Sequence, residues 1–189
     1  YGAVDFYRAC KAEGIHPIIG CEVYVARRTR FDKQHEFDAE SRHLVLLCKN
    51  ETGYRNLSYM VSQAYIEGFY IKPRIDMELL RAHSDGLIAL SACLAGEIPK
   101  RLMNGDYSGA KAYALEMRGI FGEDFYLELQ DHGIAEQTEV NRGLLRLHNE
   151  TGIPLVCTND AHYLRKEDAE NHDVLLCIQT GKTVDDENR

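Results

Sequence analysis

Short apolar runs alternate with amphipathic segments along the chain, and this alternation limits the fold more than any other feature. A short apolar run suits a buried strand, whereas apolar residues that recur every three or four positions suit a helix. Strands are predicted at residues 16–25, 43–48, 86–91, 125–129 and 154–158. Helices are predicted at residues 1–11, 56–67, 95–103, 106–120, 134–151 and 166–179, and a short helix through Ala82 is predicted after Asp76 as its N-cap.

Strands that alternate with helices predict an α/β fold with a parallel sheet and right-handed crossovers. A doubly wound sheet and a barrel both produce this alternation. We find no glycine-rich phosphate loop after any predicted strand, which weakens the nucleotide-binding doubly wound alternative. Residues 1–189 contain no evident linker or repeat, so a single domain is predicted.

The charge of the chain limits its partners. The formal net charge is −8, and a domain that grips a phosphate backbone over a broad face is usually basic. Residues 26–41 are predicted to form a long exposed loop. We interpret two basic clusters as solvated surface: Arg27, Arg28 and Arg30, then Lys72 and Arg74. Without an apolar run of roughly 20 residues or a signal peptide pattern, we expect no membrane partner and a cytoplasmic location.

Side chains that bind metals gather at the ends of the predicted strands, where α/β folds place their chemistry. Glu22 lies on the first strand, His43 opens the second, and Cys93 follows the third. Asp160 and His162 follow the fifth strand two positions apart, a spacing that lets both reach one cation. These residue types bind zinc, manganese or iron. Divalent metals held together suit phosphoester hydrolysis, because they stabilise the reacting oxygens and activate bound water.

Each of these residues also has a purely structural interpretation. Glu22 can face solvent on an edge strand, and His43 can be a histidine satisfied by its neighbours. Cys93 can be a small buried side chain; the six cysteines are widely spaced and predict no disulfide framework. The residues before His162 are good turn formers, and His132 can simply cap the helix that follows it. Their convergence at strand ends favours the metal site.

Several segments together resemble one family. Residues 19–25 read Ile-Gly-Cys-Glu-Val-Tyr-Val, and residues 86–96 read Gly-Leu-Ile-Ala-Leu-Ser-Ala-Cys-Leu-Ala-Gly. The other similar segments are residues 43–54, 72–76, 126–133 and 158–163. In this order, and over nearly the whole chain, they are similar to the PHP (polymerase and histidinol phosphatase) domain. The most similar version is the one at the amino end of bacterial DNA polymerase III alpha subunits.

The resemblance implies an irregular TIM-like (βα) barrel of the PHP type, with up to three divalent metal ions at its mouth. A cysteine, Cys93, together with two histidines favours zinc, with manganese or iron as alternatives because they accept the same nitrogen and oxygen ligands. The implied ligands are Glu22, His43, Cys93, Asp160 and His162, with Cys93 at a position where many members have histidine. The residues implied to bind substrate or to support the ligands are His132, Arg74 and Lys72.

The start of the chain departs from the family pattern. The family's first strand carries a His-x-His pair, and an Asp-His-Gly turn precedes its first helix; residues 1–11 contain neither and already read as a helix interior. We therefore expect a fragment that lacks the first strands, which makes the barrel incomplete at its amino end.

The resemblance implies a part of the replicative polymerase that supports DNA synthesis by a DNA-directed nucleotidyltransferase. It also implies a metal-dependent phosphoesterase or 3′–5′ exonuclease activity of the domain itself. The implied partners are the rest of the polymerase chain, a proofreading exonuclease, other replisome subunits and, through the parent polymerase, DNA. Two alternatives stay open: a free-standing phosphoesterase similar to histidinol phosphatases, and a scaffold without catalysis.

Overall fold

The structure of the chain is a computed structural model that describes residues 2–186. The residues form two compact units, Tyr1–Thr158 and Asn159–Arg189. Among the residues that the structure describes, no helix has both the length and the apolar composition needed to cross a bilayer.

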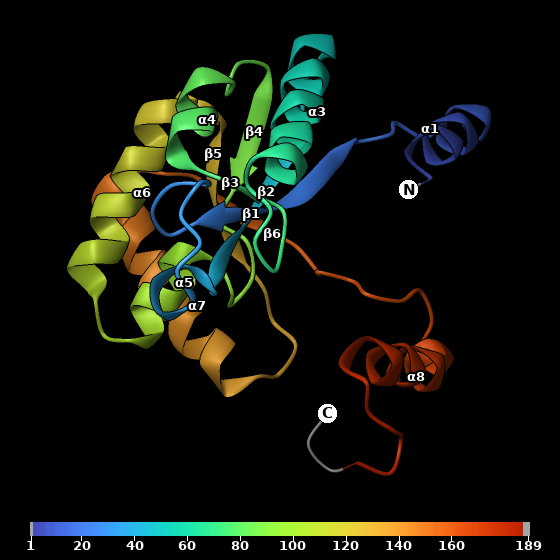
Figure 1. Cartoon of the computed structure of the whole chain (residues 1–189). Helices are drawn as coiled ribbons and strands as arrows, with labels where there is room; N and C mark the ends of the chain where they lie inside the picture. The colour runs from blue at the N-terminus through green and yellow to red at the C-terminus, as the bar shows by residue number, and fades with distance from the viewer. Residues whose placement is uncertain (1, 187–189) are drawn as a thin grey trace. The chain divides into compact units, whose positions relative to one another are not determined.

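The first unit is built on a six-stranded sheet with the order β3-β1-β2-β4-β5-β6 (Figure 1). The strands are β1 (Gly20–Ala26), β2 (Ser41–Cys48), β3 (Arg74–Ile75), β4 (Leu87–Leu90), β5 (Phe125–Leu129) and β6 (Leu155–Cys157). The mixed α/β class is as predicted. The described sheet is open, with β3 and β6 at its edges, so it does not close into a barrel.

The sheet is mixed rather than parallel. β1 pairs with β3, β4 with β5 and β5 with β6 in parallel, but β2 is antiparallel to both of its neighbours. The prediction of an all-parallel sheet was therefore wrong at β2. The reason lies in the connection from β1 to β2, which contains only the four-residue helix α2 (His35–Asp38). A parallel crossover usually needs a full helix, whereas an antiparallel pair does not.

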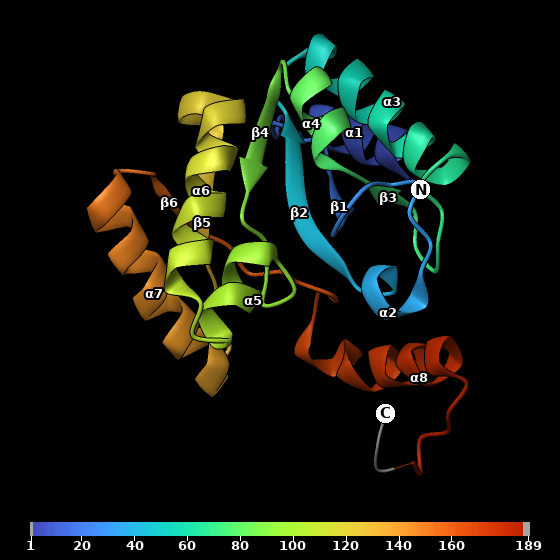
Figure 2. The ribbon, with the colours of Figure 1, turned by 60° about the vertical axis from the view of Figure 1, so that its left-hand side comes forward.

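Helices cover both halves of this sheet (Figure 2). α3 lies against β1, β2 and β3, while α6 lies against β4 and β5, and α7 against β5. The helices of the first unit are α1 (Ala3–Ala12), α2, α3 (Glu51–Ile66), α4 (Met77–Ala82), α5 (Glu97–Met103), α6 (Tyr107–Phe121) and α7 (Ala135–Thr151), with a 3-10 turn η1 (Gly122–Asp124). The second unit contains a 3-10 turn η2 (Lys166–Asp168) and α8 (Ala169–Thr180).

The start of α3 shows how a cap sets a helix boundary. The apolar pattern predicts a helix from residue 56, but α3 begins at Glu51 because Asn50 caps it. The Asn50 side chain accepts a hydrogen bond of 3.0 Å from the main-chain N–H of Gly53. An N-cap asparagine satisfies one of the otherwise unpaired amides of the first turn.

Apolar side chains between the helices and the sheet form one core. Phe125 and Leu127 of β5 are fully buried, as is Leu144 of α7. Along α7 the buried apolar residues Val140, Leu144 and Leu147 follow the spacing of one helix face. Each such side chain stabilises the fold by about 1.5–3 kcal/mol relative to an exposed position. This core holds the strand ends that carry the metal-type side chains.

The segment between β1 and β2 is exposed along most of its length, as predicted, but two of its charged side chains are buried. Asp38 is 1% exposed and accepts a 2.9 Å hydrogen bond from Nε of Arg28. Arg30 is 8% exposed and lies 3.1 Å from the carboxylate of Asp76. The first pair joins two parts of the segment to each other, and the second ties the segment to the N-cap of α4. Both fit the rule that a buried charge needs a partner of opposite charge.

Arg74 is another buried charged residue of the first unit. It is 1% exposed, and its guanidinium donates hydrogen bonds of 2.8–3.2 Å to main-chain oxygens of Gly68, Asp38, Arg30 and Asp32. The prediction that Arg30 and Arg74 belong to solvated surface clusters was wrong. The planar fork of arginine offers five donors, so it can satisfy several carbonyls that a polar segment would otherwise bury unpaired.

Candidate metal centre

Three metal-type side chains meet on one face of the sheet. Glu22 lies on β1, His43 on β2, and Cys93 follows the end of β4. His43 pairs directly with Tyr24 in the antiparallel register of β1 and β2. Glu22 is two residues before Tyr24 on the same strand, so its side chain shares that face and lies diagonal to His43. The strand pairing therefore explains why residues 21 positions apart come together.

The ligand atoms of this cluster lie close enough together to hold one metal ion. Oε1 of Glu22 lies 2.9 Å from Nδ1 of His43, and Sγ of Cys93 lies 3.6 Å from the same nitrogen. One ligand atom from each of the three residues lies within 4.8 Å of the others. A carboxylate oxygen, an imidazole nitrogen and a thiol sulfur are the donor types that zinc binds. We name Glu22, His43 and Cys93 the triad.

The triad is partly open to solvent, with 26% of the His43 side chain and 37% of the Glu22 side chain exposed. The hydrogen bonds with Cys93 and then Glu22 raise the pKa of His43 to about 9, although burial opposes the shift. A metal ion would replace the proton on this imidazole, because only the neutral ring is a ligand. The partial exposure leaves room for a water or substrate at a bound ion, as catalytic zinc sites require.

Neighbouring groups hold His43 in place. Its main-chain N–H donates a 3.1 Å hydrogen bond to the carbonyl of Ala95. Its ring meets the ring of Tyr24 edge-on, with centroids 5.1 Å apart. Nζ of Lys72 lies 5.5 Å from the centroid of the same Tyr24 ring. Tyr24 was missed in the sequence, where nothing distinguishes it from any other strand aromatic; its role follows only from the register.

The other residues predicted to support the site differ in their surroundings. Lys72 is half-buried, and its Nζ lies over the Tyr24 ring. The Tyr24 ring in turn contacts the ring of His43 in the triad. His132 is exposed, and both its main-chain N–H and its Nδ1 contact the side-chain amide of Gln137, at 2.7 and 2.8 Å. Arg74 is 1% exposed and its guanidinium is enclosed by main-chain carbonyls. Its role in binding substrate or supporting the ligands stays a prediction.

Asp160 and His162 belong to the second unit. Asp160 has a left-handed backbone with φ of 46°, and its carbonyl lies 2.8 Å from Nδ1 of His162. The rings of His162 and His172 meet edge-on with centroids 5.8 Å apart. The role of Asp160 and His162 as metal ligands stays a prediction.

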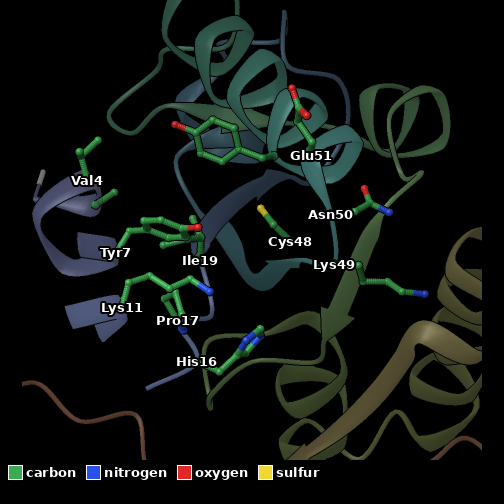
Figure 3. Close-up of a pocket in the computed structure, with 12 residues that line it drawn as sticks. Val4, Tyr7, Lys11, His16, Pro17, Ile19, Cys48, Lys49, Asn50 and Glu51 are labelled. Atoms are coloured by element: carbon green, nitrogen blue, oxygen red, sulfur yellow. The ribbon is translucent and has the colours of Figure 1, made fainter. Parts of the chain in front are cut away.

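An open pocket of about 510 Å³ lies between α1 and the start of α3. Val4, Tyr7 and Lys11 of α1 line one side, and residues 48–51 line the other (Figure 3). None of the triad residues lines this pocket. Because α1 has no buried residue, the wall it provides is an exposed helix face rather than a shaped binding surface.

Comparison with known proteins identifies the family of the chain. The family model of the PHP domain matches residues 1–132, which include all three triad residues. The DNA polymerase III subunit alpha of Treponema pallidum is 50% identical over 191 residues, and that of Thermus aquaticus is 49% identical over 191 residues. Both alignments cover 100% of this chain, which spans only about 16% of the length of each relative.

The chain is an α/β protein with a metal-type triad at its strand ends, and it belongs to the PHP domain family. The polymerase subunits to which it is similar also include that of Borreliella burgdorferi, which is 47% identical over 190 residues. The similarity therefore extends beyond the 132 residues that the family model matches, to the whole of the chain.

Proposed function

We propose that this chain is the PHP region of a bacterial DNA polymerase III alpha subunit, and that it binds divalent metal through Glu22, His43 and Cys93. The observation that carries the proposal is the meeting of oxygen, nitrogen and sulfur ligand atoms within 4.8 Å, from three different strands or strand ends. The similarity of the whole chain to alpha subunits supports the polymerase context. Zinc suits this donor set best, with manganese and iron as alternatives.

In this proposal a bound metal ion would supply an activated water and stabilise developing charge on a phosphoester. The triad holds the ion, and the partial exposure of Glu22 and His43 leaves it accessible to a substrate. Lys72, half-buried on the Tyr24 ring, would attract the negative phosphate toward the site. Asp160 and His162 would add ligands for further ions, up to the three that the family resemblance implies.

The finer fold and the partners are also part of the proposal. The strands β3 and β6 are edges of the described sheet, and further strands of a longer protein could pair there to complete an irregular barrel. The partners would be the rest of the polymerase chain, a proofreading exonuclease and other replisome subunits, with DNA reached through the polymerase. The reaction would be removal of nucleotides from a 3′ end, in the cytoplasm where the polymerase works.

Metal analysis of the purified chain tests the proposal. After zinc loading and dialysis, we expect bound zinc in the parent chain and a loss of bound zinc in Glu22→Gln, His43→Ala and Cys93→Ser. His35→Ala and Cys157→Ser are matched controls, since both side chains are exposed and lie outside the triad. Equal zinc in the triad variants and the controls would refute the metal site.

Hydrolysis is tested separately, in the full polymerase subunit. A 3′-labelled DNA strand should lose its terminal nucleotide, and Asp160→Asn combined with His162→Ala should abolish the release. Nucleotide release that is unchanged in this double variant would refute the catalytic role of the second unit's residues, while leaving metal binding by the triad in place.

A non-catalytic scaffold is the second candidate, and one observation favours it. Glu22 and Cys93 contact His43 directly, at 2.9 and 3.6 Å. The three side chains therefore satisfy one another without an ion between them. A scaffold predicts that zinc raises the melting temperature of the chain while no variant changes nucleotide release. The free-standing phosphatase alternative receives less support, because the compared relatives are polymerase subunits.

A further inference from the structure

Glu128, at the end of β5, is a buried acid that the triad does not include. It is 5% exposed, and both of its carboxylate oxygens accept hydrogen bonds. Oε2 accepts a 3.0 Å bond from the main-chain N–H of Ala92, and Oε1 accepts a 3.1 Å bond from Nε2 of Gln130. The hydroxyl of Thr158 donates to Oε1 as well. Glu128 therefore contacts the residue immediately before Cys93.

The turn that Glu128 contacts has an unusual backbone. Ala92 has φ of 63°, in the left-handed region that a residue with a Cβ rarely adopts. It is 1% exposed, so its main-chain N–H has no access to water. This geometry directs the chain from the end of β4 to Cys93, where the thiol faces His43 at 3.6 Å.

Two reciprocal hydrogen bonds clamp this turn to β5. The carboxylate of Glu128 accepts from Ala92, while the main-chain N–H of Glu128 donates a 2.8 Å bond to Oγ of Ser91. The main-chain N–H of Ser91 donates in turn to the carbonyl of Tyr126 at 3.1 Å. A strained backbone conformation persists only when the surrounding structure holds it in place. At this turn, the hydrogen bonds with β5 do so.

We propose that Glu128 is a positioning residue for Cys93: its carboxylate holds Ala92 in the left-handed turn that aims the Cys93 thiol at the triad. This inference rests on the proposed function, in which Cys93 is a metal ligand. Glu128 is not itself a ligand in the triad, since the triad consists of Glu22, His43 and Cys93. Without its carboxylate, the buried N–H of Ala92 would lose its acceptor, and the turn would relax and carry the thiol away from His43.

The alternative is that Glu128 only stabilises the fold. Melting temperature alone cannot separate these roles, because either one predicts a less stable variant. The bond between a thiolate and a metal ion does separate them. Cobalt(II) bound by a thiolate has a charge-transfer absorption in the near ultraviolet, and its intensity for each bound ion reports whether sulfur is a ligand.

The experiment titrates Co²⁺ into the full chain and follows this absorption. Glu128→Ala should weaken Co²⁺ binding about 10–100-fold, the range measured when partners that orient metal ligands are removed, and should reduce the absorption for each bound ion. Glu128→Gln should restore both, because one amide oxygen still accepts from Ala92 while Gln130 can turn its own amide to match. Leu127→Ala is the matched control on the same strand: it should lower the melting temperature and leave the cobalt spectrum unchanged.

The outcomes separate the two claims. A parent chain that shows no thiolate absorption refutes Cys93 as a ligand, and the proposed function and this inference fall together. If the parent chain shows the thiolate absorption and Glu128→Ala shows the same absorption at the same Co²⁺ affinity, the inference about Glu128 is overturned while the proposed function stands. If Glu128→Ala does not fold by circular dichroism, Glu128→Asp gives the same comparison, since it withdraws the carboxylate from Ala92 by one methylene; an unchanged spectrum there overturns the inference too.

Discussion

Arg74→Met removes a buried guanidinium while it keeps an unbranched apolar side chain in the place of the aliphatic part of the arginine. The side chain is 1% exposed and donates to four main-chain carbonyls. Three of these hydrogen bonds, to Gly68, Asp38 and Arg30, are buried. The substitution therefore leaves buried acceptors without their donor.

The size of the effect follows from two opposing terms. Three buried carbonyls that lose a donor cost about 1–3 kcal/mol each. The neutral methionine avoids the desolvation free energy of a buried cation, which is several kcal/mol. We expect a net destabilisation of about 3 kcal/mol, within the range for disruption of a buried polar network. Arg55→Met is the control: the Arg55 side chain is 77% exposed, and such a surface change is worth about 0.5 kcal/mol or less.

Urea unfolding of the two variants, followed by circular dichroism, measures the difference. With a denaturant slope of about 2–3 kcal/mol per molar, Arg74→Met should lower the midpoint by about 1–1.5 M. A variant whose midpoint falls no further than that of Arg55→Met would refute the argument that the carbonyl contacts of Arg74 stabilise the segment between β1 and β2.

Two further predictions concern the core and the acid range. Leu144→Ala, at a fully buried site of α7, should lower the free energy of unfolding by about 2–5 kcal/mol, whereas Leu145→Ala, at a side chain that is 45% exposed, should change it little; an equal loss in both would contradict the assigned helix face. The hydrogen bond from Arg28 lowers the pKa of Asp38 to about 2, below the unfolded value of about 3.9, so its ionised form contributes stability above pH 4 that is lost as the pH falls through 2. The melting temperature of Asp38→Asn should therefore lie below that of the parent at pH 6 and approach it toward pH 2, and a gap that does not depend on pH would contradict this account.

The sequence predicts most elements of this fold because their signals are local. Each apolar run that predicts a strand contains or overlaps one of the main strands, and β4 and β5 lie within one residue of the predicted ranges. The direction of β2 could not be predicted in this way. It depends on how a polar connection folds back on itself. The pairs of Arg30 with Asp76 and of Arg28 with Asp38 join residues that only the folded chain brings together.

The candidate site was predictable in its residue types but not in its geometry. Glu22, His43 and Cys93 were identified from strand ends and from the family resemblance, and the structure brings all three together. The roles of Tyr24 and Glu128 depend on register and on one left-handed turn, neither of which leaves a local signal. The sequence placed Arg74 on the surface because clustered basic residues, here Lys72 and Arg74, usually lie in solvent, whereas main-chain carbonyls enclose Arg74 in the structure.

X-ray absorption at the zinc edge tests the central claim most directly, because it identifies the atoms bonded to the ion. The account predicts a sulfur atom at about 2.3 Å and nitrogen or oxygen atoms at about 2.0–2.2 Å in the zinc-loaded parent chain, and loss of the sulfur contribution in Cys93→Ser. A parent spectrum without sulfur, or a Cys93→Ser spectrum identical to that of the parent, would contradict it.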